Sequence, residues 1–195
     1  MTDEMGTALV TGGARRIGRA IVEDLARNGF AVAIHCRSSV DVAEALADDI
    51  RRQGGRALVL SADLADAAQL PADREGLVVN MVDQRAWKTT PHFLSYQLSK
   101  SGLLTATRTL AQALAPRIRV NAIGPGPTLP SPRQDPAEFR KQAEAVLLRH
   151  GPDLCEFGRT IRYLYETRSI TGQMIALDGG QHLAWETPDI VGISE

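Results

Sequence analysis

An apolar run that ends in a glycine turn, followed at once by an amphipathic helix, constrains this chain more than any other feature. The run is Thr7–Val10, the turn is Thr11–Gly18, and apolar residues at helical spacing continue to Asn28. This order places helix N-terminal amides at the turn, where they can bind a phosphate. Gly12 permits the tight turn and Gly18 permits close approach. The segment therefore predicts a site for a dinucleotide pyrophosphate, with an ordinary strand-to-helix turn as the alternative.

The alternation of strand and helix continues after this turn. Residues 31–35 and 57–60 are predicted strands, separated by a helix over 40–53 that ends at Gly54 and Gly55. Such steps predict an α/β fold with a doubly wound parallel sheet, and no linker divides the chain, so 1–195 is expected to form a single Rossmann domain. Further strands are predicted at 77–82, 118–123 and 173–177, and further helices at 95–114, 136–150 and 153–167.

Composition excludes several classes of protein. The chain has 195 residues, of which 44% are hydrophobic, and a formal net charge of −1, which argues against binding to nucleic acid or to a membrane surface. No secretory signal and no membrane-spanning apolar run are recognisable. The two cysteines, Cys36 and Cys155, lack the number and spacing of a disulfide framework or a zinc site. We therefore expect free thiols, no metal and a cytoplasmic location.

The end of the second predicted strand indicates the type of dinucleotide. Folds that bind NAD commonly place an acidic residue there for the ribose hydroxyl, whereas a 2′-phosphate needs cations and hydrogen-bond donors. Here the strand ends with His35 and is followed by Arg37, Ser38 and Ser39. A guanidinium with two hydroxyls suits a phosphate dianion, so NADPH is favoured over NADH, with Arg16 as a second cation. The alternative is that these arginines are solvated surface charges.

Tyr96 and Lys100 are the candidate reactive pair. They are four residues apart in a predicted helix and therefore lie on one face. An ammonium near a phenol favours its ionised form and makes the tyrosine a usable proton donor. With Asp83 thirteen residues upstream, the pair predicts nicotinamide-dependent reduction of a carbonyl or an imine. The alternatives are a capping aspartate, a tyrosine at the core edge and a solvated lysine.

Three motifs that span nearly the whole chain resemble the short-chain dehydrogenase/reductase family: Thr11-Gly12 to Gly18, Tyr96-x-x-x-Lys100 and Asn121-x-x-x-Pro125-Gly126. Asp83 stands where the family usually has a catalytic serine, which resembles the pteridine reductase branch. The resemblance implies that Tyr96 donates the proton, that Lys100 lowers the pKa of Tyr96 and binds the nicotinamide ribose, and that Asp83 assists protonation of a pterin ring nitrogen.

The resemblance also implies an NADPH site. Pro125 and Gly126 would shape the backbone beside the nicotinamide, Thr128 would lie near its carboxamide, and Asp63 would bind the adenine amine unless it caps a turn. The expected cofactor-binding residues are Gly12, Arg16, Ile17, Gly18, His35, Arg37, Ser38, Ser39, Asp63, Leu64, Lys100, Pro125, Gly126 and Thr128.

One step of the family pattern is missing from this chain. The family has a further strand and two helices between Asp63 and the strand that precedes Asp83, but only residues 64–76 are present there. Because one βαβ unit takes about 30 residues, about 60 residues are absent. Either the strand beside the first one is absent, or the strand 77–82 takes its place. The absent helices include one that usually contributes to the family's dimer interface.

These features favour an NADPH-dependent reductase that acts on a pterin or a dihydrofolate-like substrate. A general carbonyl or 3-oxoacyl reductase is the alternative within enzymes, and a catalytically silent NADPH-binding protein is the alternative outside them. The expected partners are a small-molecule substrate and further copies of the chain in a homo-oligomer.

Overall fold

A computed structural model describes residues 5–61, 76–132, 134–187 and 191–192. The chain divides into two compact units, one formed by Met1–Glu75 with Asp153–Arg168 and the other by Gly76–Pro152 with Ser169–Glu195. Each unit contains a three-stranded parallel sheet with helices packed on it, so the predicted α/β class with parallel strands is confirmed.

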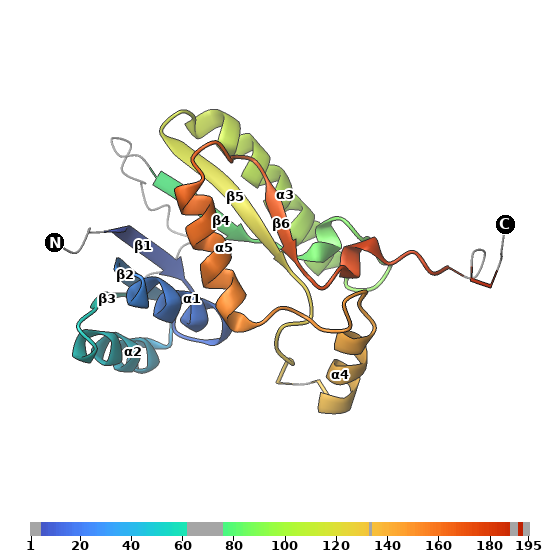
Figure 1. The fold of residues 1–195 in the computed structure, drawn as a ribbon, viewed down its shortest axis with the longest axis horizontal. Helices are drawn as coiled ribbons and strands as arrows, with labels where there is room; N and C mark the ends of the chain where they lie inside the picture. The colour runs from blue at the N-terminus through green and yellow to red at the C-terminus, as the bar shows by residue number, and fades with distance from the viewer. Residues whose placement is uncertain (1–4, 62–75, 133, 188–190, 193–195) are drawn as a thin grey trace. The chain divides into compact units, whose positions relative to one another are not determined.

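The first unit is a parallel sheet in the strand order β1-β2-β3, with α1 and α2 as its crossover helices (Figure 1). The central strand is almost wholly buried, as its continuous apolar sequence predicts. Residues Ile21, Val22 and Leu25 form the buried stripe of α1. The elements are β1 (Met5–Thr11), α1 (Arg16–Arg27), β2 (Phe30–Cys36), α2 (Val40–Arg52) and β3 (Arg56–Ser61).

A helix from much later in the chain completes this unit. Helix α5 (Leu154–Glu166) lies beside α1 in Figure 1. Arg162 Nε donates to Asp24 Oδ2 at 2.9 Å, and the rings of Phe30 and Tyr165 meet edge to face at 5.1 Å. The packing is close because Gly158 has no side chain: a Cβ there would collide with the side chain of Asp24.

The second unit is a parallel sheet in the order β4-β5-β6. Val82, Leu104, Ala122 and Met174 form a buried cluster that joins the sheet to the long helix α3. The elements are β4 (Gly76–Met81), the 3-10 helix η1 (Gln84–Ala86), α3 (Leu94–Leu114), β5 (Ile118–Pro125), α4 (Pro136–Glu144), β6 (Met174–Leu177) and the 3-10 helix η2 (Gln181–Leu183).

Asn121 has a structural function in this unit. Its side chain is fully buried in β5, donates to the carbonyl of Ile170 at 2.9 Å and accepts from the amide of Gln173 at 3.0 Å. Both ends of the amide are therefore used to fasten β5 to the segment that leads into β6.

One sequence expectation changes at the level of elements. The helix predicted over 136–150 ends at Glu144, because Arg149 adopts a positive φ and the amide of Leu148 donates to the carbonyl of Gly179 instead of continuing the helix. Within the first unit β1 pairs with β2, and within the second unit β4 pairs with β5. No helix of the described ranges is long and apolar enough to cross a membrane.

Candidate active site

Asp83 and Tyr96 form a direct hydrogen bond at the carboxyl end of β4. Asp83 precedes η1, and its Oδ1 accepts from the amide of Arg85 at 2.8 Å. Its Oδ2 accepts from the Tyr96 hydroxyl, also at 2.8 Å. Tyr96 lies in the first turn of α3, so one carboxylate caps a short helix and orients a phenol at the start of a long one.

Lys100 lies one turn beyond Tyr96 on α3, as the spacing predicts. Its ammonium donates to the carbonyl of Met81, the last residue of β4, at 2.9 Å. The Nζ atom is 5.6 Å from the centre of the Tyr96 ring. The structure therefore brings Asp83, Tyr96 and Lys100 together at one end of β4.

The pKa of Tyr96 moves in the direction opposite to the one expected from Lys100. Partial burial of Tyr96, which is 42% exposed, its hydrogen bond to Asp83 and the negative charge of Asp83 together raise the pKa to about 12, while Arg85 opposes the change. The direct partner of the hydroxyl is Asp83 and not Lys100, whose ammonium donates to a backbone carbonyl. Tyr96 is therefore a protonated donor at neutral pH.

The predicted nicotinamide-side residues form a tight turn after β5, the strand next to β4. The amide of Gly126 donates to the carbonyl of Leu177 at 2.8 Å, and a Cβ on Gly126 would lie 2.6 Å from the Cα of Asp178. Only glycine allows this close approach. Thr128 Oγ1 donates to the carbonyl of Gly126 at 3.1 Å. Because β4 and β5 are parallel, this turn and Asp83 lie at the same edge of the sheet.

The glycine turn of the first unit has the backbone that its sequence predicts. Gly12 has a φ of +63°, and a Cβ on Gly18 would collide with the carbonyl oxygen of Gly12. Arg15, which precedes α1, makes no side-chain cap to the first helical amides, and the first turn of α1 contains no acidic residue. Ile17 lies in this first turn. The helix start therefore suits an anionic group.

The residues at the end of β2 lie close to this turn. Thr11 and His35 pair across β1 and β2, and the amide of Gly13 donates to the carbonyl of His35 at 3.1 Å. His35 is buried, whereas Arg37 and Ser38 are exposed. Ser39 precedes α2 and makes no side-chain cap. Arg16 begins α1 with a positive φ of 53°. Two further expected cofactor residues, Asp63 and Leu64, lie outside the described residues.

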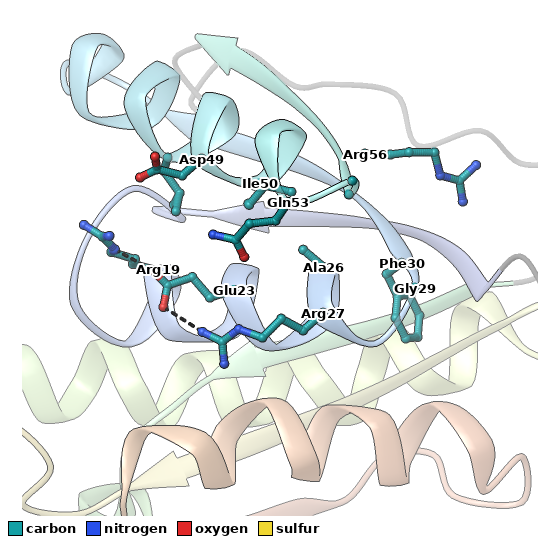
Figure 2. Close-up of a pocket in the computed structure, with 13 residues that line it drawn as sticks. Arg19, Glu23, Ala26, Arg27, Gly29, Phe30, Asp49, Ile50, Gln53 and Arg56 are labelled. Atoms are coloured by element: carbon teal, nitrogen blue, oxygen red, sulfur yellow. Dashed lines mark hydrogen bonds and ion pairs between the residues drawn. The ribbon is translucent and has the colours of Figure 1, made fainter. Parts of the chain in front are cut away.

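A groove between α1 and α2 is distinct from the predicted cofactor site (Figure 2). It is lined by residues of α1, by the second half of α2 and by the starts of β2 and β3, including Phe30 and Arg56. Glu23 bridges two arginines on its rim, with bonds of 2.8 Å to Arg19 and 3.4 Å to Arg27. None of the predicted cofactor residues lines it, and parallel α/β sheets bind ligands at the carboxyl ends of their strands rather than at these starts.

Sequence reasoning did not identify His182. This residue lies in η2, and its Nδ1 is 2.8 Å from Oδ2 of the buried Asp178. The only local sign of this pair in the sequence is the spacing of four residues between Asp178 and His182. The contact of His182 with Trp87 could not be predicted, because the two residues are almost a hundred positions apart. Trp87 itself is 42% exposed.

Two family models match the chain. Residues 64–182 match the model described as enoyl-(acyl carrier protein) reductase, and residues 6–73 match the model described as short chain dehydrogenase. Among curated proteins, the 3-oxoacyl-[acyl-carrier-protein] reductase FabG of Staphylococcus aureus (strain N315) is 26% identical over 243 residues, covering 91% of this chain and 98% of the relative. The dihydromonapterin reductase of Citrobacter koseri is 34% identical over 107 residues, covering 54% of this chain and 44% of the relative.

A solved structure gives a more extensive match. FolM alternative dihydrofolate reductase 1 from Brucella suis, in complex with NADP, is 50% identical, with a TM-score of 0.90 and coverage of 98% of this chain and 100% of that chain.

The comparisons also bear on the missing step. In the FabG alignment, 91% of the 195 residues is about 177, which leaves about 66 of the 243 aligned positions without a residue of this chain. This agrees in size with the strand and two helices whose absence the sequence predicts.

Proposed function

Since the chain belongs to the short-chain dehydrogenase/reductase family, we propose that it is an NADPH-dependent reductase of a reduced pterin. The observation that carries this proposal is the hydrogen bond of 2.8 Å between the Tyr96 hydroxyl and the Asp83 carboxylate. The name of the FolM relative, an alternative dihydrofolate reductase crystallised with NADP, and the name of the dihydromonapterin reductases support the substrate class and the cofactor.

The Asp83–Tyr96 pair suits a pterin better than a simple ketone. The amino-pyrimidine ring of a pterin carries N–H donors, and a carboxylate accepts such donors whereas it repels a carbonyl oxygen. In the proposed reaction Asp83 binds the ring through its N–H groups, and Tyr96 donates its proton to the ring nitrogen that becomes basic as the adjacent carbon is reduced. Lys100 fixes the end of β4 through Met81 and keeps a positive charge beside the phenol.

The residues at the ends of β1 and β2 fit the predicted cofactor. Gly12 and Gly18 leave open the approach to the uncapped start of α1, which would hold the pyrophosphate, and Arg37 and Ser38 would hold the 2′-phosphate. When bound, NADPH would supply the hydride. Pro125, Gly126 and Thr128 would contact the nicotinamide end, and Lys100 its ribose.

The first test is the loss of NADPH absorbance with dihydromonapterin, dihydrofolate and an acetoacetyl thioester as substrates. We expect turnover of a dihydropterin, and we expect Tyr96→Phe to lower kcat by at least about 100-fold, the usual contribution of a general acid. The matched control is Tyr163→Phe, which changes an exposed tyrosine of α5 in the first unit. Binding of NADPH should be unchanged in both variants.

Two other outcomes would replace this function by one of its alternatives. Turnover of the thioester alone would favour a 3-oxoacyl reductase, which the FabG match over 91% of the chain supports. NADPH binding without turnover of any substrate would favour a silent binding protein, which the loss of about 66 aligned positions supports.

The proposal further includes a single domain over 1–195, a homo-oligomer and a cytoplasmic location. The location is supported by the free thiols of Cys36 and Cys155.

A further inference from the structure

The second unit contains a histidine that is oriented by a buried carboxylate. His182 Nδ1 is 2.8 Å from Asp178 Oδ2, and the side chain of Asp178 is only 2% exposed. The same carboxylate accepts from the amides of Gly180 at 2.9 Å and His182 at 2.8 Å. Because a carboxylate can only accept hydrogen bonds, Nδ1 carries the hydrogen, and Nε2 of the neutral ring is left as an acceptor.

The backbone that carries His182 is held on its other side as well. The carbonyl of Gly179 accepts from the amide of Leu148 at 2.9 Å, and a side chain on Gly180 would meet that of Leu147 at 3.1 Å. The turn between Asp178 and His182 is therefore fastened to the segment that follows α4. A ring held in this way can recognise a ligand group with little loss of conformational entropy.

The position of His182 relates it to the Asp83–Tyr96 pair. Its ring lies 5.1 Å from the ring of Trp87, which directly follows η1, and Asp83 directly precedes η1. A 3-10 helix rises about 2.0 Å per residue, so the four steps from Asp83 to Trp87 span about 8 Å. Asp178 lies against Gly126, in the turn after β5. The histidine thus lies at the edge of the sheet that carries Asp83.

We propose that His182 determines substrate specificity by accepting a hydrogen bond from a hydroxyl group on the side chain of a reduced pterin. This inference rests on the proposed function, in which Asp83 binds the pterin ring. The side chain of His182 is 22% exposed, and Trp87, which is 42% exposed, offers an apolar surface beside it for the carbon chain.

The test compares two substrates that differ only in the side chain. Dihydromonapterin has a hydroxylated side chain, whereas 6-methyl-dihydropterin has none. In His182→Phe we expect KM for dihydromonapterin to rise about 5- to 10-fold, the value of one hydrogen bond, with kcat unchanged and with no effect on the methyl substrate. His182→Gln, which can still accept, should recover part of the preference.

Equal losses on both substrates in His182→Phe would indicate a merely structural role and overturn the inference. An unchanged preference for the hydroxylated substrate would overturn it as well.

Binding separates this inference from the proposed function. Trp185→Phe leaves Trp87 as the sole tryptophan, so that quenching of its fluorescence measures the Kd of each pterin without turnover. If the protein binds dihydropterins without reducing them, the reductase proposal fails, while a lost binding preference in His182→Phe still supports the inference. If neither pterin binds, both are overturned.

Discussion

The carboxylate of Asp83 caps η1 and also accepts the hydrogen bond of the candidate proton donor Tyr96. One oxygen of its carboxylate holds the amide of Arg85 and thereby starts η1, and the other holds the Tyr96 hydroxyl. The hydrogen bond to the amide of Arg85 orients the carboxylate, and in this orientation its other oxygen can accept from the Tyr96 hydroxyl. The two interpretations that the sequence left open are therefore compatible.

Removal of the Asp83 charge should lower the pKa of Tyr96. In Asp83→Asn we expect the pKa to fall from about 12 but to stay above 10, because burial, the largest cause of the increase, is retained. The measurement is the ultraviolet titration of tyrosinate, with Tyr96→Phe subtracted to isolate this residue. An unchanged titration in Asp83→Asn would show that the carboxylate has no influence on the phenol.

The same pKa has a consequence for stability. The folded-state pKa of about 12 lies above the unfolded value of 10.0, so the folded protein retains a proton that the unfolded chain loses. The contribution of Tyr96 to stability is therefore complete below pH 10 and declines between pH 10 and 12. Urea denaturation across this range should show a smaller decline in Tyr96→Phe than in the wild-type protein.

The site was predictable from sequence where it depends on local spacing. Tyr96 and Lys100 share a helix face because of their spacing, and Asp83 lies at the end of a strand that its apolar residues reveal. The direction of the Tyr96 pKa was not predictable, because it depends on burial and on the hydrogen bond to Asp83. His182 was not found because its partner Trp87 comes from a distant segment.

At the scale of elements, helix boundaries followed the sequence when local signals set them. Helices α1 and α2 end close to Gly29 and Gly54, as predicted. Helix α4 ends earlier than its pattern indicates. After it, the amide of Leu148 bonds to the carbonyl of Gly179, a tertiary contact that the local pattern does not reveal. The pairing of β4 with β5 is likewise a long-range property. Periodicity identifies a strand but does not identify its neighbours.

The contact between α1 and α5 should depend on a single glycine. In Gly158→Ala the new methyl group collides with the side chain of Asp24, which also disturbs the ion pair with Arg162. Overpacking of this kind costs about 1–3 kcal/mol in the free energy of unfolding. The matched control is Gly102→Ala in α3, where a Cβ meets no atom within 4 Å and helix propensity should stabilise by about 0.5–1 kcal/mol. Urea denaturation of both variants gives the comparison, and equal midpoints would contradict the packing argument.

At the scale of the whole molecule, the two units are interleaved in sequence. The chain leaves the first unit after Glu75, returns to it at Asp153 and leaves it again after Arg168, so neither unit is one continuous segment. Helix α5, which packs on α1, is therefore joined at both ends to the second unit. Units connected in this way are expected to unfold together, because unfolding of one unit frees the chain segments that hold the other in place.

Cooperative unfolding can be tested because each unit carries its own probe. Cys36 is buried in β2 of the first unit, whereas Trp87 and Trp185 both belong to the second. In Cys155→Ser, which removes the exposed thiol, labelling of Cys36 during urea denaturation reports opening of the first unit, and tryptophan fluorescence reports the second. We expect the two transitions to occur at the same urea concentration. Saturating NADPH should shift both midpoints to a higher urea concentration by the same amount, since a ligand of the folded state stabilises every part of a cooperative domain. Labelling of Cys36 at a lower urea concentration than the fluorescence change would show instead that the units unfold separately.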